Sequence, residues 1–485
     1  MTTLRRRLIA IPHPREGLWL GLIVALLACL PVLVAHYPQM SDYPAHLARY
    51  HVMLDSGHSA DLARYYAFVW QWTGNLGVDI LIRPFAALFG LEAGGRVIAG
   101  LIPVFTGLGI LSVEWALRRR ITGASLLAFV FIWSPMMLIG LLNFTLGLAL
   151  ALFAFALWVR LEEWNYRWLT FLPIGLVVWL SHLSAWGVLG MMVFGYEWHR
   201  RGLLRAMIAP WPLLMPLFPL VFGHGTSGAF SYGAYWWLYK QGIWIKAMRD
   251  QLYGLDYFSL IAVGFTVVLA LIFRRFDGRL GRAAWLLMLG SLVMPRHISG
   301  GDYADYRMIS SGLMLAVLAI DWPTTRLALW LSPLLFAARL GVTTLAWQAD
   351  SAETERLLVG LDHVPQGARL ASAVQVALYD WPLNHFEHIG GYAVVRRDAL
   401  VNANFALAHV HMLSLKTGGP GFIDPSQRIL QSQPAPVDLN TFAPAQQADY
   451  LWYVGSKDQL TLPLGAVPLY ATPHSVLLHL AKRAL

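Results

Sequence analysis

Long apolar runs separated by short polar turns fill the first two thirds of the chain. A helix of about 20 apolar residues is long enough to cross the hydrocarbon core of a membrane. The pattern therefore predicts an α-helical polytopic membrane protein with about 11 transmembrane helices. They are expected at residues 17–36, 95–117, 122–141, 144–160, 168–183, 184–198, 204–222, 257–273, 283–295, 308–321 and 326–346.

Residues 78–91 form a further apolar stretch, but Asp79, Arg83 and Pro84 interrupt it. Charges and a proline inside such a stretch disfavour a spanning helix. This pattern is more typical of a re-entrant or interfacial segment.

From about Trp347 onward the hydropathy pattern changes, and no run is long enough to span a membrane. Short stretches rich in β-branched and aromatic residues alternate there with helical patterns, which indicates a small α/β domain. Strands are expected at GARLASAV (367–374), GYAVVRRDALV (391–401) and DYLWYVG (449–455), and helices at 352–361 and 405–415. We expect a transmembrane domain at 1–346 and a soluble α/β domain at 347–485.

Composition supports the membrane class, because 57% of the 485 residues are hydrophobic and only 13% are charged. Soluble chains carry roughly 25% charged residues. The net charge of +9 does not indicate nucleic acid, since the basic residues cluster in short turns between apolar runs. Cys29 is the only cysteine, so a disulfide within the chain is excluded.

The basic clusters also predict the orientation, because cytoplasmic loops of membrane proteins are enriched in Lys and Arg. With a cytoplasmic N-terminus, all of them fall on the cytoplasmic side and the C-terminal domain lies in the periplasm, at a bacterial inner membrane. The clusters are Arg5–Arg7, Arg118–Arg120, Arg160 with Arg167, Arg200–Arg201, Arg274–Arg275 with Arg279 and Arg282, and Arg326. The loops expected outside are 37–94, 223–256 and 296–307.

The first external loop opens with YPQMSDYPAHLARYH (37–51), in which Pro44 favours a helix start. Asp42, His46 and Arg49 then stand at i, i+4 and i+7, on nearly the same side of that helix. A carboxylate and an imidazole backed by a cation suit general-base chemistry near neutral pH. The alternative is that Asp42 only caps the helix while His46 and Arg49 touch lipid headgroups.

Cations in the other external loops are candidates for binding an anionic headgroup. Arg296 and Arg307 bracket RHISGGDYADYR (296–307), and the planar guanidinium matches phosphate. The alternative is an ion pair of Arg307 with Asp302 or Asp305.

Two further stretches hold candidate binding residues. Lys240 and Lys246 lie in AYWWLYKQGIWIKAMR (234–249), whose aromatic residues equally fit an anchoring belt at the membrane interface. His182, in LSHLSAW, is either a structural histidine or a pocket residue.

Metal and nucleotide motifs are weak or missing. NHFEH (384–388) and HVH (409–411) lack a recognised zinc spacing, and we assign no metal ligand, although the sequence leaves a divalent metal open. Glycine-rich nucleotide motifs are missing from the sequence.

The first span, the acidic residue opening a large external loop, the many later spans and the external C-terminal domain together resemble the multi-pass glycosyltransferases of the C-type fold (GT-C). The resemblance covers most of the chain in architecture but rests at residue level on Asp42 in SDYPAH and on Arg307 in DYADYR. Members often place two acids together in this loop, whereas Tyr43 follows Asp42 here.

The resemblance implies that Asp42 is a catalytic base and that external cations hold the phosphate of a polyprenyl-linked sugar. Because no nucleotide sugar is present outside the cytoplasm, the expected donor is a lipid-linked sugar and the expected acceptor a glycan, lipid or protein. We expect inverting transfer, contact with membrane lipids, and no nucleic-acid partner. The alternatives are a transporter or flippase, a ligase or polymerase of lipid-linked saccharides, and a non-catalytic receptor.

Overall fold

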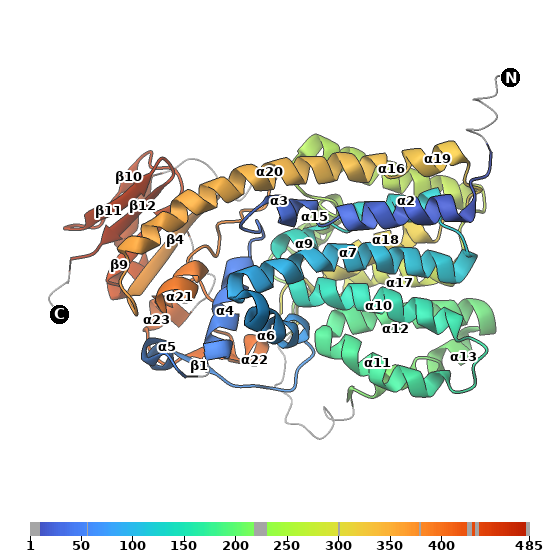
Figure 1. Cartoon of the computed structure of the whole chain (residues 1–485), viewed down its shortest axis with the longest axis horizontal. Helices are drawn as coiled ribbons and strands as arrows, with labels where there is room; N and C mark the ends of the chain where they lie inside the picture. The colour runs from blue at the N-terminus through green and yellow to red at the C-terminus, as the bar shows by residue number, and fades with distance from the viewer. Residues whose placement is uncertain are drawn as a thin grey trace.

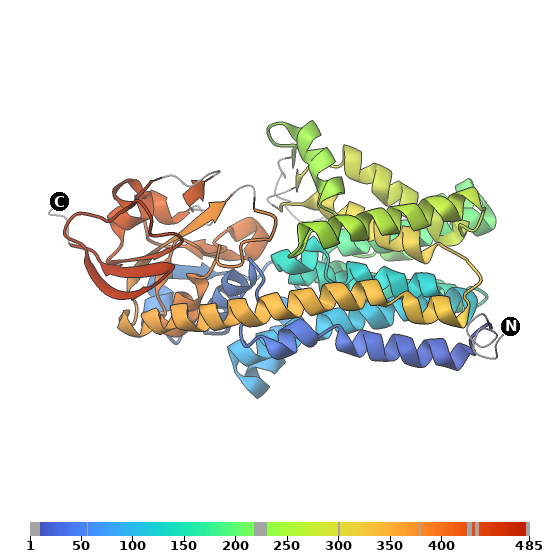
Figure 2. The ribbon, with the colours of Figure 1, turned by 90° about the horizontal axis from the view of Figure 1, so that it is seen from above.

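A helical bundle and a mixed α/β domain lie at opposite ends of the molecule (Figure 1). The computed structural model describes residues 10–55, 57–217, 230–298, 301–377, 380–423, 429–431 and 436–481. Helix α20 (Leu334–Leu358) runs from the bundle to the α/β domain and is seen along its length in Figure 2. The boundary expected between residues 346 and 347 therefore falls inside a continuous helix.

Each of the eleven expected spans coincides with helical structure within its described residues; residues 218–222 of the span expected at 204–222 lie outside them. The helices are α2 (Pro14–Leu27), α3 (Leu30–Val34), α7 (Leu91–Arg118), α8 (Gly123–Leu127), α9 (Pro135–Ile139), α10 (Leu142–Arg160), α11 (Arg167–Ser181), α12 (Leu183–Arg201), α13 (Leu203–Ile208), α16 (Tyr253–Ile272), α17 (Gly278–Val293), α18 (Ala304–Leu318), α19 (Arg326–Leu331) and α20. Many are shorter than expected.

Within the described residues, five helical segments are long and apolar enough to cross a membrane, by length and composition. They are Pro14–Val34, Leu91–Arg118, Leu142–Arg160, Tyr253–Ile272 and Arg326–His363. The chain is thus a multi-pass helical membrane protein, whereas the expected count of about 11 crossings includes helices too short to meet this criterion.

The segment expected as one span at 122–141 is broken into α8, a 3₁₀ turn (Ala128–Phe131) and α9. Pro135 follows Ser134, whose ψ of 163° is extended. A residue before proline is disfavoured in the α region, and the extended Ser134 separates α9 from the preceding turn.

Four elements lie in residues 37–94, the segment predicted to be the first external loop: α4 (Tyr43–Asp55), α5 (Ala60–Tyr65), β1 (Tyr66–Phe68) and α6 (Gly77–Phe89). Helix α6 continues through Pro84, burying Val78 and Ile82 while Leu88 is 75% exposed. This two-sided helix is compatible with an interfacial segment, and its position in the membrane stays a prediction.

The described parts of the loops expected outside at 223–256 and 296–307 form a second region, which packs against the bundle. It comprises β2 (Phe230–Ser231), α15 (Trp236–Ile245) and β3 (His297–Ile298). β2 and β3 form a short antiparallel pair that joins the two external loops expected at 223–256 and 296–307.

A six-stranded mixed sheet forms the core of the C-terminal domain, with order β11-β12-β9-β4-β5 and β7 also paired with β4. β4 pairs in parallel with β5, β7 and β9, whereas β9, β12 and β11 are antiparallel. The strands are β4 (Arg369–Ala377), β5 (Leu400–Val401), β7 (Ile429–Gln431), β9 (Tyr450–Val454), β11 (Val467–Thr472) and β12 (Ser475–His479). The strands expected at 367–374 and 449–455 are confirmed.

The strand expected at 391–401 is wrong over most of its length. Residues 391–397 form helix α21 (Gly391–Arg397), and only Leu400–Val401 are strand. The apolar run Tyr392–Val394 is buried, and a short buried run has the same pattern in a helix as in a strand. Helix α21 packs against α4 of the first external loop.

The helix expected at 405–415 is also mostly wrong. It is reduced to α22 (Ala408–His411), followed by β6 (Leu413–Leu415), which pairs antiparallel with β1. The helix expected at 352–361 is the end of α20 and a 3₁₀ turn, Val359–His363. The first external loop and the C-terminal domain are therefore joined by both strand pairing and helix packing.

Candidate functional site

Asp42 lies where the bundle, the first external loop and the C-terminal domain meet. Its backbone N–H donates to the carbonyl of Ile139 at the end of α9, at 2.8 Å. Gly140, with φ +101°, lies against Asp42, because a Cβ at this glycine would be 3.3 Å from the Asp42 Cβ. The His46 N–H donates to the Asp42 carbonyl, so Asp42 stands at the start of α4. Its side chain is 19% exposed and can be reached from outside.

His388, from the C-terminal domain, is the imidazole that lies beside the Asp42 carboxylate. Its Nε2 atom is 3.7 Å from Asp42 Oδ1. Burial lowers the pKa of His388 to about 4, so the ring is neutral near pH 7. Sequence reasoning missed this neighbour: NHFEH was considered only as a metal motif.

Arg307, on α18, places a buried cation near the same carboxylate. The residue is 8% exposed, and the charges of Asp302, Asp42 and Asp305 act on its guanidinium. Its Nη1 lies 3.5 Å from Ser184 Oγ, and its Nε has no hydrogen-bond partner among the described residues. A buried guanidinium with an unused donor is suited to binding an anion.

His182 lies near Arg307, whose charge acts on it. Its Nδ1 accepts the backbone N–H of Ser184 at 2.9 Å and thereby caps α12. This contact gives His182 a structural role, the first of the two alternatives, while leaving it next to the candidate anion site.

Arg49 forms a buried ion pair with an acid other than Asp42. Both its terminal nitrogens donate to the carboxylate of Asp79 on α6, and both side chains are fully buried. Asn143, at the start of α10, donates to the same carboxylate at 3.0 Å. The Arg49 charge therefore ties α4, α6 and the bundle together rather than meeting lipid headgroups.

His46 lies in an aromatic cluster with Phe405 and His411, whose ring centroids are 5.0 and 6.2 Å from its own. Burial, followed by the charge of Arg49, lowers the pKa of His46 well below its ordinary value. The residue is 7% exposed.

The other expected binding cations are mostly paired. Arg296 donates to Asp302 at 2.9 and 3.0 Å and stacks over Tyr239. Lys240 is buried, and its ammonium pairs with Asp305 and donates to the carbonyl of Ser291. Asp302 and Asp305, the alternative partners expected for Arg307, thus pair with other cations.

Lys246 is the remaining expected cation of this region. It follows α15, and burial together with the nearby charge of Arg249 lowers the pKa of its half-buried ammonium.

The histidines of NHFEH and HVH do come together in part, since His388 and His411 both contact the ring of Phe405. Over the described residues, however, no group of three or more His, Cys, Asp or Glu is placed to hold a metal ion.

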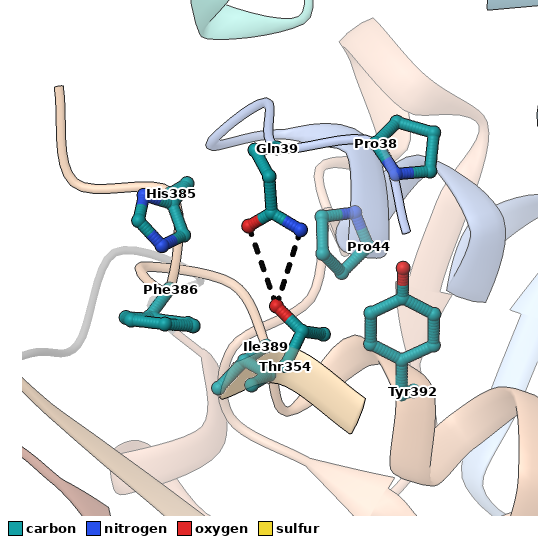
Figure 3. Close-up of a pocket in the computed structure, with 8 residues that line it drawn as sticks. All are labelled: Pro38, Gln39, Pro44, Thr354, His385, Phe386, Ile389 and Tyr392. Atoms are coloured by element: carbon teal, nitrogen blue, oxygen red, sulfur yellow. Dashed lines mark hydrogen bonds between the residues drawn. The ribbon is translucent and has the colours of Figure 1, made fainter. Parts of the chain in front are cut away.

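A small pocket lies next to this region, between the first external loop, α20 and the start of α21 (Figure 3). Its empty volume is about 200 Å³, part of it open to solvent. Gln39 and Thr354 are hydrogen-bonded across it. The lining residues are Pro38, Gln39, Pro44, Thr354, His385, Phe386, Ile389 and Tyr392.

Comparison with known proteins gives one structural likeness. No protein-family model matches the chain, and no curated protein matches it. The chain is similar to the crystal structure of ArnT from Cupriavidus metallidurans bound to undecaprenyl phosphate, with a TM-score of 0.49 and 11% sequence identity. The similarity covers 96% of this chain and 97% of that one. A likeness of this degree assigns neither a ligand nor a residue role to this protein.

Proposed function

We propose that the protein is a membrane glycosyltransferase of the GT-C type. It moves a sugar from a polyprenyl-phosphate donor to an acceptor on the periplasmic face, with Asp42 as general base. The observation that carries this proposal is the placement of Asp42: a partly exposed carboxylate whose charge acts on the buried cation Arg307, at the junction of bundle and C-terminal domain.

The proposed reaction is a single inverting displacement at the anomeric carbon. The acceptor oxygen bonds to this carbon as Asp42 takes the hydroxyl proton, and the bond from the carbon to the phosphate oxygen breaks. The electron pair of that bond leaves with the polyprenyl phosphate. Because a phosphate is already a good leaving group, one carboxylate is sufficient.

Arg307 is the cation that best fits the donor phosphate. Its unused Nε donor would bind a phosphate oxygen and stabilise the charge that develops as the bond breaks. Arg49, Arg296 and Lys240 have carboxylate partners, so in this proposal they shape the site. His46, His182 and Lys246 remain candidates for contacts with the sugar or headgroup.

The bundle provides the apolar surroundings that a polyprenyl tail requires. The basic clusters favour an orientation with the N-terminus in the cytoplasm and the C-terminal domain in the periplasm. In this orientation Asp42 and Arg307 lie on the periplasmic side, where lipid-linked sugars are the available donors. The acceptor is a glycan, a lipid or a protein.

A transfer assay tests the proposal. The purified protein in lipid nanodiscs is given polyprenyl phosphate carrying a radiolabelled hexose, pentose or amino sugar, together with a bacterial envelope extract as acceptor. We expect label to move from the lipid fraction to acceptor with wild type and with Asp61→Asn, a control at a partly exposed acid on α5, but not with Asp42→Asn. Equal transfer by Asp42→Asn, or none by wild type with any donor, contradicts the proposal.

A further inference from the structure

We propose that His388 is a positioning residue for Asp42, so that the C-terminal domain completes the active site. This inference rests on the proposed function and adds to it a role for the domain at the catalytic carboxylate. It assigns His388 an action through Asp42 and no contact with the substrate.

The first observation is the pair itself. His388 Nε2 lies 3.7 Å from Asp42 Oδ1, within ion-pair reach but longer than a direct hydrogen bond. Hydrogen bonds of catalytic groups are often long without substrate and shorten when it binds. Phe405 packs on the His388 ring at 5.1 Å between centroids, which limits the directions in which the ring can turn.

The second observation is that the segment before His388 is anchored to the membrane bundle. Arg249, which precedes α16, donates to the carbonyls of Asp380, Trp381 and Pro382. The indole N–H of Trp381 donates to Asp256 on α16 at 2.6 Å. A displacement of the bundle helices would therefore move the segment that carries His388.

The third observation is that the same segment is fixed to the loop that carries Asp42. Ser41 Oγ donates to the Asn384 carbonyl at 2.7 Å, and the Phe386 N–H donates to Asn384 Oδ1 at 2.9 Å. Just beyond His388, a Cβ on Gly391 would lie 2.4 Å from the Pro44 carbonyl oxygen, so only glycine allows this approach. The residues before His388 are thus hydrogen-bonded to Ser41, and the residues after it pack against Pro44.

The chemistry follows from the charge state of the ring. The groups around His388 are the Asp42 carboxylate, the backbone carbonyl of Ala403, and the rings of His46 and His411, on both of which Arg49 also acts. Burial keeps the imidazole neutral, so it carries a single N–H. In the Nε2–H tautomer it donates one hydrogen bond to the Asp42 carboxylate without neutralising it. A base held in this way keeps its charge and one orientation toward the acceptor hydroxyl.

Conservative and non-conservative variants separate positioning from simple packing. Gln carries an amide nitrogen near the position of the imidazole Nε2, whereas Ala carries no donor. We expect His388→Ala to lower kcat by about 100-fold with the donor KM nearly unchanged, since a misplacement of about 1 Å can cost that much. We expect His388→Gln to recover at least a tenth of wild-type kcat.

The matched control is His51, at the other end of α4 from Asp42. Its Nε2 lies 2.7 Å from Oδ1 of Asp398, so it forms a second histidine–carboxylate pair between α4 and the C-terminal domain. His51→Gln should retain wild-type kcat, and thermal unfolding of every variant shows whether it is folded. If His388→Ala does not fold, the comparison of His388→Gln with His51→Gln decides, with a kcat loss confined to His388→Gln supporting the role.

A double variant tests whether His388 acts through Asp42. Transfer of hexose from polyprenyl phosphate is measured for Asp42→Asn with and without His388→Ala. We expect no further loss in the double variant, because residues acting as one unit are not additive. A folded His388→Ala with wild-type kcat, or an equal additional loss in the Asp42→Asn background, overturns the inference. Full activity of Asp42→Asn overturns the proposed function instead.

Discussion

The guanidinium of Arg49 and the carboxylate of Asp79 form a fully buried ion pair that joins helices α4 and α6. Asn143 donates to the same carboxylate and extends the contact to α10. The loop that carries Asp42 is therefore fixed to the bundle through charges removed from water.

Removing one partner of this pair leaves the other charge buried without compensation, which typically costs about 3–5 kcal/mol. We expect Arg49→Met to lower the thermal unfolding temperature of the purified protein strongly. The double variant Arg49→Met with Asp79→Leu should regain much of the loss, since both charges are then gone. A single variant as stable as wild type would show that the pair does not hold the loop.

Arg307 is expected to govern donor affinity. Loss of a hydrogen bond to a charged group costs about 1.5–3 kcal/mol, so Arg307→Gln should weaken undecaprenyl phosphate binding about 10- to 100-fold. Binding to nanodisc-embedded protein can be followed by ligand-dependent thermal shift. Arg64→Gln, at an exposed arginine of the first loop, is the control. Unaltered binding by Arg307→Gln would remove Arg307 from the phosphate site.

The lowered pKa values of His385 and His388 are expected to make the free energy of unfolding depend on pH. Burial lowers the pKa values of His385 and His388 to about 4, from an ordinary 6.5. As the pH falls below 6.5 the unfolded chain takes up these protons first, so stability decreases toward pH 4, by about 1.4 kcal/mol per pH unit for each group. We expect the unfolding temperature to fall from pH 6.5 to 5, and less steeply for His385→Gln with His388→Gln. An equal fall in both proteins would exclude these two groups as the cause.

The orientation of the chain can be tested by cysteine labelling in a Cys29→Ala background. Asp458, in the C-terminal domain, and Glu163, between α10 and α11, are both exposed. We expect a membrane-impermeant maleimide to label Asp458→Cys in intact spheroplasts, and Glu163→Cys only after lysis. The reverse pattern would place the candidate site on the cytoplasmic side.

The positions of the helices could be predicted because apolar runs determine where a chain can cross a membrane. The lengths of the helices and the positions of their breaks, such as the one at Pro135, were harder to predict from the sequence. The pattern at Tyr392–Val394 was ambiguous between strand and helix. The packing of α21 against α4 decides the structure there, and α4 is distant from α21 in the sequence. The choice of strand or helix there depended on tertiary structure.

Within the candidate site, Asp42 could be predicted from the sequence, but the residues that surround it could not. Asp42 stands out as an acid at the start of the first external loop. Arg49 was expected beside it but pairs with Asp79, and no periodicity in the sequence relates Arg49 to Asp79. His388 comes from the far end of the sequence, so only the packing of the C-terminal domain on α4 brings it to Asp42.

The role of Asp42 is tested most directly by a single-turnover measurement. Enzyme in excess is loaded with polyprenyl phosphate carrying a radiolabelled sugar and then mixed with acceptor, so that the rate reports chemistry separately from binding. Loss of a general base typically costs 10²–10⁴-fold, so Asp42→Asn should slow this step by about 10²–10⁴-fold while binding undecaprenyl phosphate as wild type does. A single-turnover rate for Asp42→Asn equal to that of wild type would contradict the account.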